Sequence, residues 1–167
     1  QAALVFNGTG SVVQSGAAGL KTLTLTGSST GDNEMGLSLT DTGGGLTMGL
    51  TKAGTGLWIL SAANGANTYT GATTITAGEL RVSAGAGNLT TAGTLTLNGG
   101  VLGTSGTFSR VIGTAANQVS WTANTAGGLA ASTAPLTVNF GGAAAQVSFG
   151  TGGIGNGTGA FILSGAS

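Results

Sequence analysis

Few side chains in this sequence could take part in catalysis. The 167 residues include four acids and four bases, and neither histidine nor cysteine occurs. The stretch Gly27-Ser28-Ser29-Thr30-Gly31 fits the G-x-S-x-G pattern of hydrolase nucleophiles, but that site needs a histidine base and a strand-to-helix turn. We therefore interpret the stretch as a turn. The same absences exclude thiol nucleophiles and metal sites built from thiolates or imidazoles.

The acids suggest at most a weak metal site. Asp32, Glu34 and Asp41 lie close to one another in the sequence and could offer oxygen ligands to calcium. They lack the regular D-x-D-x-D-G pattern of a calcium loop, so a solvated loop between two strands is the competing interpretation. Glu79 and Arg81 alternate onto one face of a strand and predict a surface ion pair. We predict no enzymatic activity, no cofactor and, beyond this weak calcium loop, no metal.

Aromatic and threonine side chains are the remaining candidates for a binding surface. Trp58, Trp121 and Tyr69 could stack on a carbohydrate, although both tryptophans lie in apolar runs typical of a core. Tyr69 follows a different pattern, because its turn-like context predicts an exposed side chain. Thr-x-Thr pairs could form a regular hydroxyl grid on a flat sheet, as in ice-binding solenoids, but their irregular spacing in the sequence argues against this. The pairs lie at Thr22, Thr24 and Thr26, at Thr74 and Thr76, and at Thr94 and Thr96.

The composition describes an apolar, nearly uncharged chain. Glycine accounts for 35 residues and proline for one, while apolar residues make up 40% and the mean hydropathy is +0.37. Disordered glycine-rich chains are polar, so this composition favours one folded domain. With a formal net charge of zero the surface offers nucleic acid no electrostatic attraction. A chain without cysteine suits export, and no run reaches the ~18 apolar residues that span a membrane.

The elements that position these residues are short β-strands. Alternating or β-branched runs recur about every 8 to 12 residues, which is typical of all-β proteins. Asn-Gly pairs at Asn7, Asn64, Asn98 and Asn156 lie between runs and favour tight turns. The predicted strands cover residues 4–6, 23–26, 37–40, 57–60, 73–75, 80–82, 95–97, 111–112, 119–121, 136–140, 147–149 and 161–163.

Internal repetition favours a β-solenoid over a β-sandwich. GTGLWILS, which starts at Gly54, returns as GTGAFILS from Gly157, and TLTLTG from Thr22 returns as TLTLNG from Thr94. Similar strands at irregular spacing predict stacked coils joined by loops of different length. With about 20 to 30 residues per coil, the chain would form roughly six to eight coils. The sandwich remains the alternative architecture.

One stretch resembles a known repeat family. Its residues read L-T-K-x-G-x-G and then N-T-Y-T-G, followed by a glycine and an alternating strand, and it is similar to the autotransporter-associated β-strand repeat, or passenger-associated transport repeat. The repeat covers residues 50–82, and residues 154–167 resemble the start of a second copy. The residues that carry the resemblance are Leu50, Thr51, Lys52, Gly54, Gly56, Asn67, Thr68, Tyr69, Thr70, Gly71, Gly78 and Leu80.

The resemblance implies a right-handed parallel β-helix in the exported passenger of a bacterial surface protein. We expect residues 1–167 to form a single extracellular segment that does not insert into the membrane. Both ends of the chain have strand-like sequences, and this predicts continuation of the solenoid, either in a longer chain or by end-to-end self-association. The first interpretation is thus a structural module of a surface fibre, filament or stalk. The alternative is an adhesin passenger that binds glycans or surfaces through exposed Thr, Asn and aromatic side chains.

Overall fold

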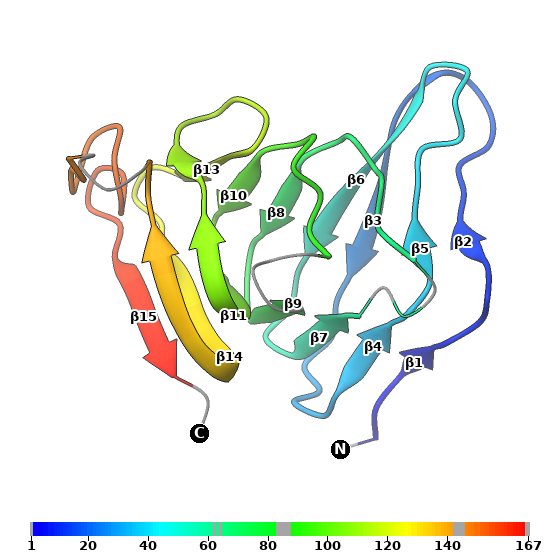
Figure 1. Cartoon of the computed structure of the whole chain (residues 1–167), viewed down its shortest axis with the longest axis horizontal. Coiled ribbons are helices and arrows are strands. Elements are labelled where there is room, and N and C mark those ends of the chain that lie inside the picture. Colours follow the sequence, from blue (N-terminus) through cyan, green and yellow to red (C-terminus); the bar gives the residue numbers. More distant parts are fainter. Residues whose placement is uncertain (1, 62, 64, 83–87, 142–145, 166–167) are drawn as a thin grey trace.

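The chain winds as a coil of short parallel strands. The computed structural model describes residues 2–61, 63, 65–82, 88–141 and 146–165, in which every regular element is a β-strand. All pairs between the named strands are parallel. None of these residues belongs to a helix that could cross a membrane. Figure 1 shows the coils following one another along the long axis of the molecule.

Two long sheets run along this axis, and a short third sheet lies beside them. The first sheet consists, in spatial order, of β1 (Val5–Phe6), β4 (Asn33–Met35), β7 (Leu57–Leu60), β9 (Glu79–Val82), β11 (Val101–Ser109), β14 (Gly127–Asn139) and β15 (Phe161–Gly165). The second sheet consists of β12 (Val111–Ile112), β13 (Gln118–Trp121), β10 (Leu95–Leu97), β8 (Thr73–Ile75), β6 (Leu46–Lys52) and β3 (Gly19–Leu25). The third pairs β2 (Ser11–Val12) with β5 (Ser38–Leu39).

This topology is a parallel β-helix. Within the first sheet each strand pairs with a strand one coil further along the chain, and the coils differ in length. Leu57 pairs with Glu79 in a short coil, whereas Gly128 pairs with Ile162 in a longer one. The seven strands of the first sheet agree with the roughly six to eight coils expected. A sandwich would instead need antiparallel hairpins or meanders. The solenoid prediction is therefore confirmed and the sandwich alternative is wrong.

The core is a set of columns in which side chains of successive coils stack. In the first sheet one column runs through Trp58, Leu80, Leu102 and Leu129, all of which are buried. Inward side chains alternate with outward ones, as in the buried–intermediate pattern of β8, β9, β10 and β13. Each column thus joins residues that are separated in the sequence by a whole coil.

Aromatic side chains fill the C-terminal coils. Trp121 packs edge-to-face on Phe140 and Phe161, with ring centroids 5.8 and 5.5 Å apart. Phe108 joins the same cluster through Phe140 at 6.3 Å. These edge-to-face geometries are the ones that aromatic pairs prefer. The C-terminal coils therefore add an aromatic cluster to the core.

Most predicted strands are present, with shifted bounds. Sequence reasoning missed β2, β4, β6 and β11. Three of these strands contain serine, glycine or acids in place of alternating apolar residues, and β6 contains a glycine and ends at the charged Lys52. The predicted strand at 147–149 is wrong: only the single bridge between Phe149 and Ile154 forms. Asn64 and residues 166–167 of the second repeat copy lie outside the described residues.

The stacked columns predict a large effect of core truncation. We expect Leu80→Ala to lower the free energy of unfolding by about 3 kcal/mol, because it leaves a cavity in a fully buried column. The matched control is Ile59→Ala, because Ile59 lies in the neighbouring strand β7 and is only partly buried. The control should lose about 1 kcal/mol. Urea unfolding followed by circular dichroism measures both, and equal losses would contradict the assignment of the two faces.

Candidate functional site

Lys52 lies in an apolar column of the core although it is charged. It is in register with Leu25 in one neighbouring coil and with Ile75 in the other, and it is fully buried. Its Nζ donates hydrogen bonds to three backbone carbonyl oxygens, those of Ala53, Gly54 and Ala77, at 2.8, 2.8 and 3.0 Å. Burial lowers the pKa of the Lys52 ammonium, and the carboxylate of Glu79 partly offsets this. Lys52 therefore ties the corner of its own coil to the corner of the next.

The glycines of the repeat form that corner. Gly54 and Gly78 have φ values of +68° and +62°, which favour glycine. A Cβ on Gly56 would lie 2.3 Å from the carbonyl oxygen of Ser29, so the backbones of two coils are in direct contact there. The stretch GTGAFILS from Gly157 resembles GTGLWILS from Gly54, and a Cβ on its Gly159 would lie 2.2 Å from the carbonyl oxygen of Thr125. Glycine therefore has the same role in both stretches.

Asparagine side chains link successive coils. Asn67 Oδ1 accepts a hydrogen bond from the Leu39 amide at 2.8 Å, and Asn67 Nδ2 donates to the Asn88 carbonyl at 2.7 Å. One side chain thus bridges the coil before and the coil after its own. The neighbouring Thr68 amide also donates to the Leu39 carbonyl at 2.8 Å.

A second bridge of this kind was missed by sequence reasoning. Asn33 Oδ1 accepts from the Leu4 amide at 3.0 Å, and its Nδ2 donates to the Leu57 carbonyl at 2.7 Å. A single asparagine beside two acids has no distinctive pattern, and we attributed this segment to a loop. The residue instead opens strand β4 and is buried.

Tyr69 corrects our expectation of an exposed aromatic residue. Its side chain is fully buried, and its hydroxyl lies 2.6 Å from Thr73 Oγ1. Burial raises the pKa of the Tyr69 phenol to about 12. The two tryptophans are buried as well, and their indole N–H groups donate to the carbonyls of Thr26 (2.9 Å) and Gly127 (3.1 Å). No carbohydrate platform can therefore form from these three aromatic residues.

Asp41 stabilises the loop that precedes β6 and the coil that follows it. Its Oδ1 accepts from the Met48 amide at 2.7 Å, and its Oδ2 accepts from the Thr70 amide at 3.2 Å and the Thr70 hydroxyl at 2.5 Å. Burial alone would raise the pKa of the Asp41 carboxyl, but the hydrogen bonds from Thr70 and Met48 together lower it below its ordinary value. The oxygens of this carboxylate thus join two coils.

The structure does not gather the three predicted calcium ligands. Glu34 lies in strand β4 and accepts from the Ser61 hydroxyl at 2.5 Å, whereas Asp41 lies beyond β5 and has the partners given above. Asp32 lies just before β4 and lines a groove. In the described part of the chain no three acids, histidines or cysteines form a group that could hold a metal ion.

The other repeat residues are structural. Leu50 and Leu80 are fully buried in the core, and Thr51 points outward from β6. Gly71 allows close packing, because a Cβ there would lie 2.3 Å from the carbonyl oxygen of Met48. The repeat as a whole therefore supplies core side chains, corners and links between coils.

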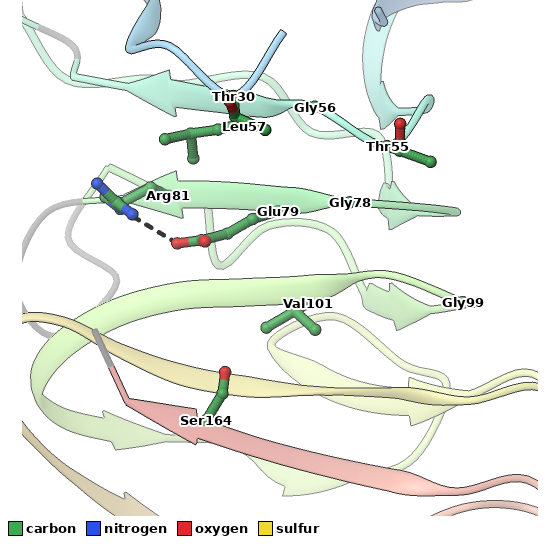
Figure 2. A pocket seen from close by; sticks show the side chains of 10 residues that line it. All are labelled: Thr30, Thr55, Gly56, Leu57, Gly78, Glu79, Arg81, Gly99, Val101 and Ser164. Carbon is green, nitrogen blue, oxygen red and sulfur yellow. Dashed lines mark hydrogen bonds and ion pairs between the residues drawn. The ribbon is translucent and has the colours of Figure 1, made fainter. Parts of the chain in front are cut away.

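A polar groove lies on the outer face of the first sheet. It has a volume of about 480 Å³, and Figure 2 shows Glu79 and Arg81 pointing into it from β9. Arg81 Nε donates to Glu79 Oε1 at 3.1 Å, which confirms the predicted ion pair. The lining also includes hydroxyl side chains of three other coils, from Thr30, Thr55 and Ser164, and the apolar side chains of Leu57 and Val101. The groove can offer hydrogen bonds to a polar molecule.

The groove lacks the groups that acid–base hydrolysis requires. Glycosidases use two carboxyl groups on either side of the scissile bond, and Glu79 is the single acid in this lining. A neighbouring groove of about 480 Å³ contains Arg81 and one acid, Asp32. Neither groove therefore holds a pair of carboxylates.

The fold and its interior links define a class of protein: a β-solenoid whose polar side chains join coils to one another. Residues 50–82 match the passenger-associated-transport-repeat family. The chain thus carries an autotransporter passenger repeat, as the residues of that stretch indicated.

A relative supports this assignment. The chain is 40% identical over 94 residues to a Brucella suis protein described as "Adhesin BmaC autotransporter". The match covers 56% of this chain and 2% of the relative, so the chain spans a small fraction of that protein's length. No solved structure matches the chain. The repeat match and this relative together indicate an extracellular location at the bacterial cell surface.

The hydrogen bonds of Lys52 predict a specific loss of stability. We expect Lys52→Met to lower the free energy of unfolding by about 2 kcal/mol, because three carbonyl oxygens lose their shared donor. Lys21→Met is the control, since Lys21 is exposed and the change should stay within ~0.5 kcal/mol. Urea unfolding measures both variants. An unchanged or more stable Lys52→Met protein would show that the ammonium contributes nothing as a link.

The lowered pKa of Asp41 predicts a loss of stability in acid. A carboxyl whose pKa is lower in the folded chain stabilises the fold above its unfolded pKa, and this contribution disappears as the pH falls through the folded pKa. Urea unfolding at pH 7 and pH 2 should therefore show a smaller pH dependence for Asp41→Asn than for the parent chain. The control Asp32→Asn should keep the parent's dependence, because the Asp32 carboxylate makes no hydrogen bond or ion pair among the described residues. Identical pH profiles for the parent and Asp41→Asn would contradict this role.

Proposed function

We propose that this chain is a non-catalytic structural module of a cell-surface passenger, and that further coils continue its β-helix at both ends. These coils belong to the same polypeptide or to another copy. The observation that carries the proposal is that the core column through Leu80 and Leu129 ends in an exposed side chain at the C-terminal end. Leu163 is in register with Leu129, yet 68% of Leu163 is exposed while Leu129 is 1% exposed.

The C-terminal end surface is apolar. A groove of about 390 Å³ opens there between β14 and β15, and its lining consists almost entirely of apolar side chains. They include Leu136, Val138, Phe140, Phe161 and Leu163. Phe149 nearby is 73% exposed and packs on Phe161 at 6.4 Å. Apolar surface of this kind favours coverage by another coil.

The opposite end has a similar surface. Leu4, Val5 and Phe6 are 54%, 46% and 42% exposed, and β1 is an edge strand of the first sheet. An edge strand has unpaired backbone groups that can bind another strand. A further coil would pair with these groups and bury the apolar side chains in one step. Both end surfaces therefore support continuation along the axis.

The description of the relative as an adhesin supports a second function, attachment to a ligand. Binding of a glycan by stacking on aromatic side chains is not favoured, because Trp58, Tyr69 and Trp121 are buried. An adhesive role would therefore need polar side chains on an outer face of the solenoid. This role is compatible with a structural module, since a solenoid can bind through its sides while its ends continue.

Association of the chain in solution tests the structural role. We expect the chain of residues 1–167 to form end-to-end oligomers as its concentration rises, because each end can pair with the other. Leu163→Lys should shift this association to at least about tenfold higher concentration by placing a charge on the apolar end. The control Thr74→Lys places the same charge on the side of the coil, and it should associate like the parent. Analytical ultracentrifugation measures all three.

Two outcomes would contradict the proposal. A chain that stays monomeric at every concentration would show that its ends do not accept another coil. Equal association by the parent and Leu163→Lys, together with a loss in Thr74→Lys, would show contact through the side of the solenoid.

A further inference from the structure

The outer face of the second sheet carries an unbroken column of hydroxyl side chains. Five strands from five coils contribute one residue each: Thr24, Thr51, Thr74, Thr96 and Ser120. Their register is direct, with each residue paired to the next. In a parallel sheet these positions repeat every ~4.8 Å along the axis. Figure 1 shows the strands β3, β6, β8, β10 and β13 side by side.

This alignment corrects an expectation from the sequence. The members of the column are unequally spaced along the chain, and the step from Thr24 to Thr51 is longer than the step from Thr74 to Thr96. We took such unequal spacing as an argument against a regular array. The loops absorb the differences in coil length, and the backbone pairing keeps the hydroxyls in line.

The hydroxyls are accessible and partly free. All five residues are exposed or partly exposed. Among the described residues the hydroxyls of Thr24, Thr51 and Thr74 make no hydrogen bond within the chain, and that of Thr96 lies 3.4 Å from Ser120 Oγ. A hydroxyl can donate one hydrogen bond and accept two. The column therefore presents a row of available donors and acceptors.

Strand propensity alone does not explain the column. Threonine suits any exposed strand, but so do valine and isoleucine. The outer face of the first sheet, built from the same coils, shows no such uniformity. There one column contains Leu57, Glu79, Val101, Gly128 and Ile162. Outward-facing positions of the first sheet thus accept many residue types, although Leu57 and Gly128 among them are buried, whereas the column of the second sheet contains hydroxyl residues alone.

We propose that this hydroxyl column binds a neutral polysaccharide chain that lies along the axis of the β-helix. The column contains no charged residue, so an anionic polymer would gain no ion pair there. A sugar polymer presents a regular series of hydroxyls that both donate and accept hydrogen bonds, and this matches the chemistry of the column. Several weak hydrogen bonds in a line would act together through effective concentration. The next outward-facing position along these strands adds the polar residues Thr76, Asn98 and Thr122, although Ala53 in the same row is apolar.

Binding to microcrystalline cellulose, a neutral linear glucan, tests the proposal. We expect the chain of residues 1–167 to sediment with cellulose. The triple variant Thr51→Val, Thr74→Val, Thr96→Val should bind about tenfold more weakly or worse, because it removes three hydroxyls and keeps the β-branched shape. The matched variant with serine at the same three positions keeps the hydroxyls and should bind like the parent. Circular dichroism and the urea midpoint verify that each variant is folded.

A second control separates the two outer faces. Thr30→Val with Thr55→Val removes hydroxyls from the groove beside Glu79 and should leave binding unchanged. Loss of binding in this variant alone would place the ligand in the groove and overturn the proposal. If the valine variant does not fold, the serine variant still tests the proposal. It keeps the three hydroxyls, so loss of cellulose binding by a folded serine variant would contradict their role.

Other ligands would also overturn the proposal. If the chain binds none of cellulose, chitin, xylan and dextran, the column is not a site for neutral polysaccharide. Retention in growing ice with no polysaccharide binding would assign the column to an ice surface instead. Leu163→Lys should bind cellulose like the parent, so failure of this proposal and failure of end-to-end association can be told apart.

Discussion

The direct contact of one coil's backbone with the next is the constraint on which this structure depends. Parallel strands lie ~4.8 Å apart, and where the chain turns between sheets no side chain fits between successive coils. Gly56 and Gly78 occupy such corners, where a Cβ would lie 2.3 and 2.5 Å from a carbonyl oxygen of the coil before. The same contact places each coil in register with the last. Core columns and outer columns alike follow from that register.

The interior polar groups solve a problem that this stacking creates. Every corner leaves carbonyl and amide groups that the sheets do not pair, and buried groups of this kind are costly unless they find partners. Lys52, Asn67 and Asp41 provide these partners, and each reaches a neighbouring coil. The hydrogen bonds of the Arg110 guanidinium are only partly satisfied. Its Nη2 donates to the Thr90 carbonyl at 2.8 Å, while its buried Nη1 has no hydrogen-bond partner among the described residues. Lys52 and Asn67 place such links in the passenger repeat, whereas Asp41 and Asn33 place others before it.

The two long sheets have outer faces of different character. The first carries grooves around the Glu79–Arg81 pair, and the second carries the hydroxyl column. A bulge between Thr104 and Gly106 interrupts the pairing of β11 with β14, the two longest strands, in the first sheet. Different parts of the described chain therefore have different roles. The interior links stabilise the fold, the two ends are the proposed sites of continuation, and the outer face of the second sheet is the proposed site of ligand binding.

The sequence by itself determined the class of fold and excluded most chemistry. Alternation with a period of two is local, so runs such as that of β10 could be recognised without knowledge of their neighbours. The absence of histidine and cysteine, and the repeat pattern around Lys52, could also be read directly from the sequence. Only the tertiary structure decided that Tyr69 is buried, that Lys52 enters an apolar column, and that Thr24 aligns with Thr51 and Thr74. Coil lengths vary with the loops, and hydrogen bonds between coils fix the register, so these placements depend on residues of other coils that are distant in the sequence.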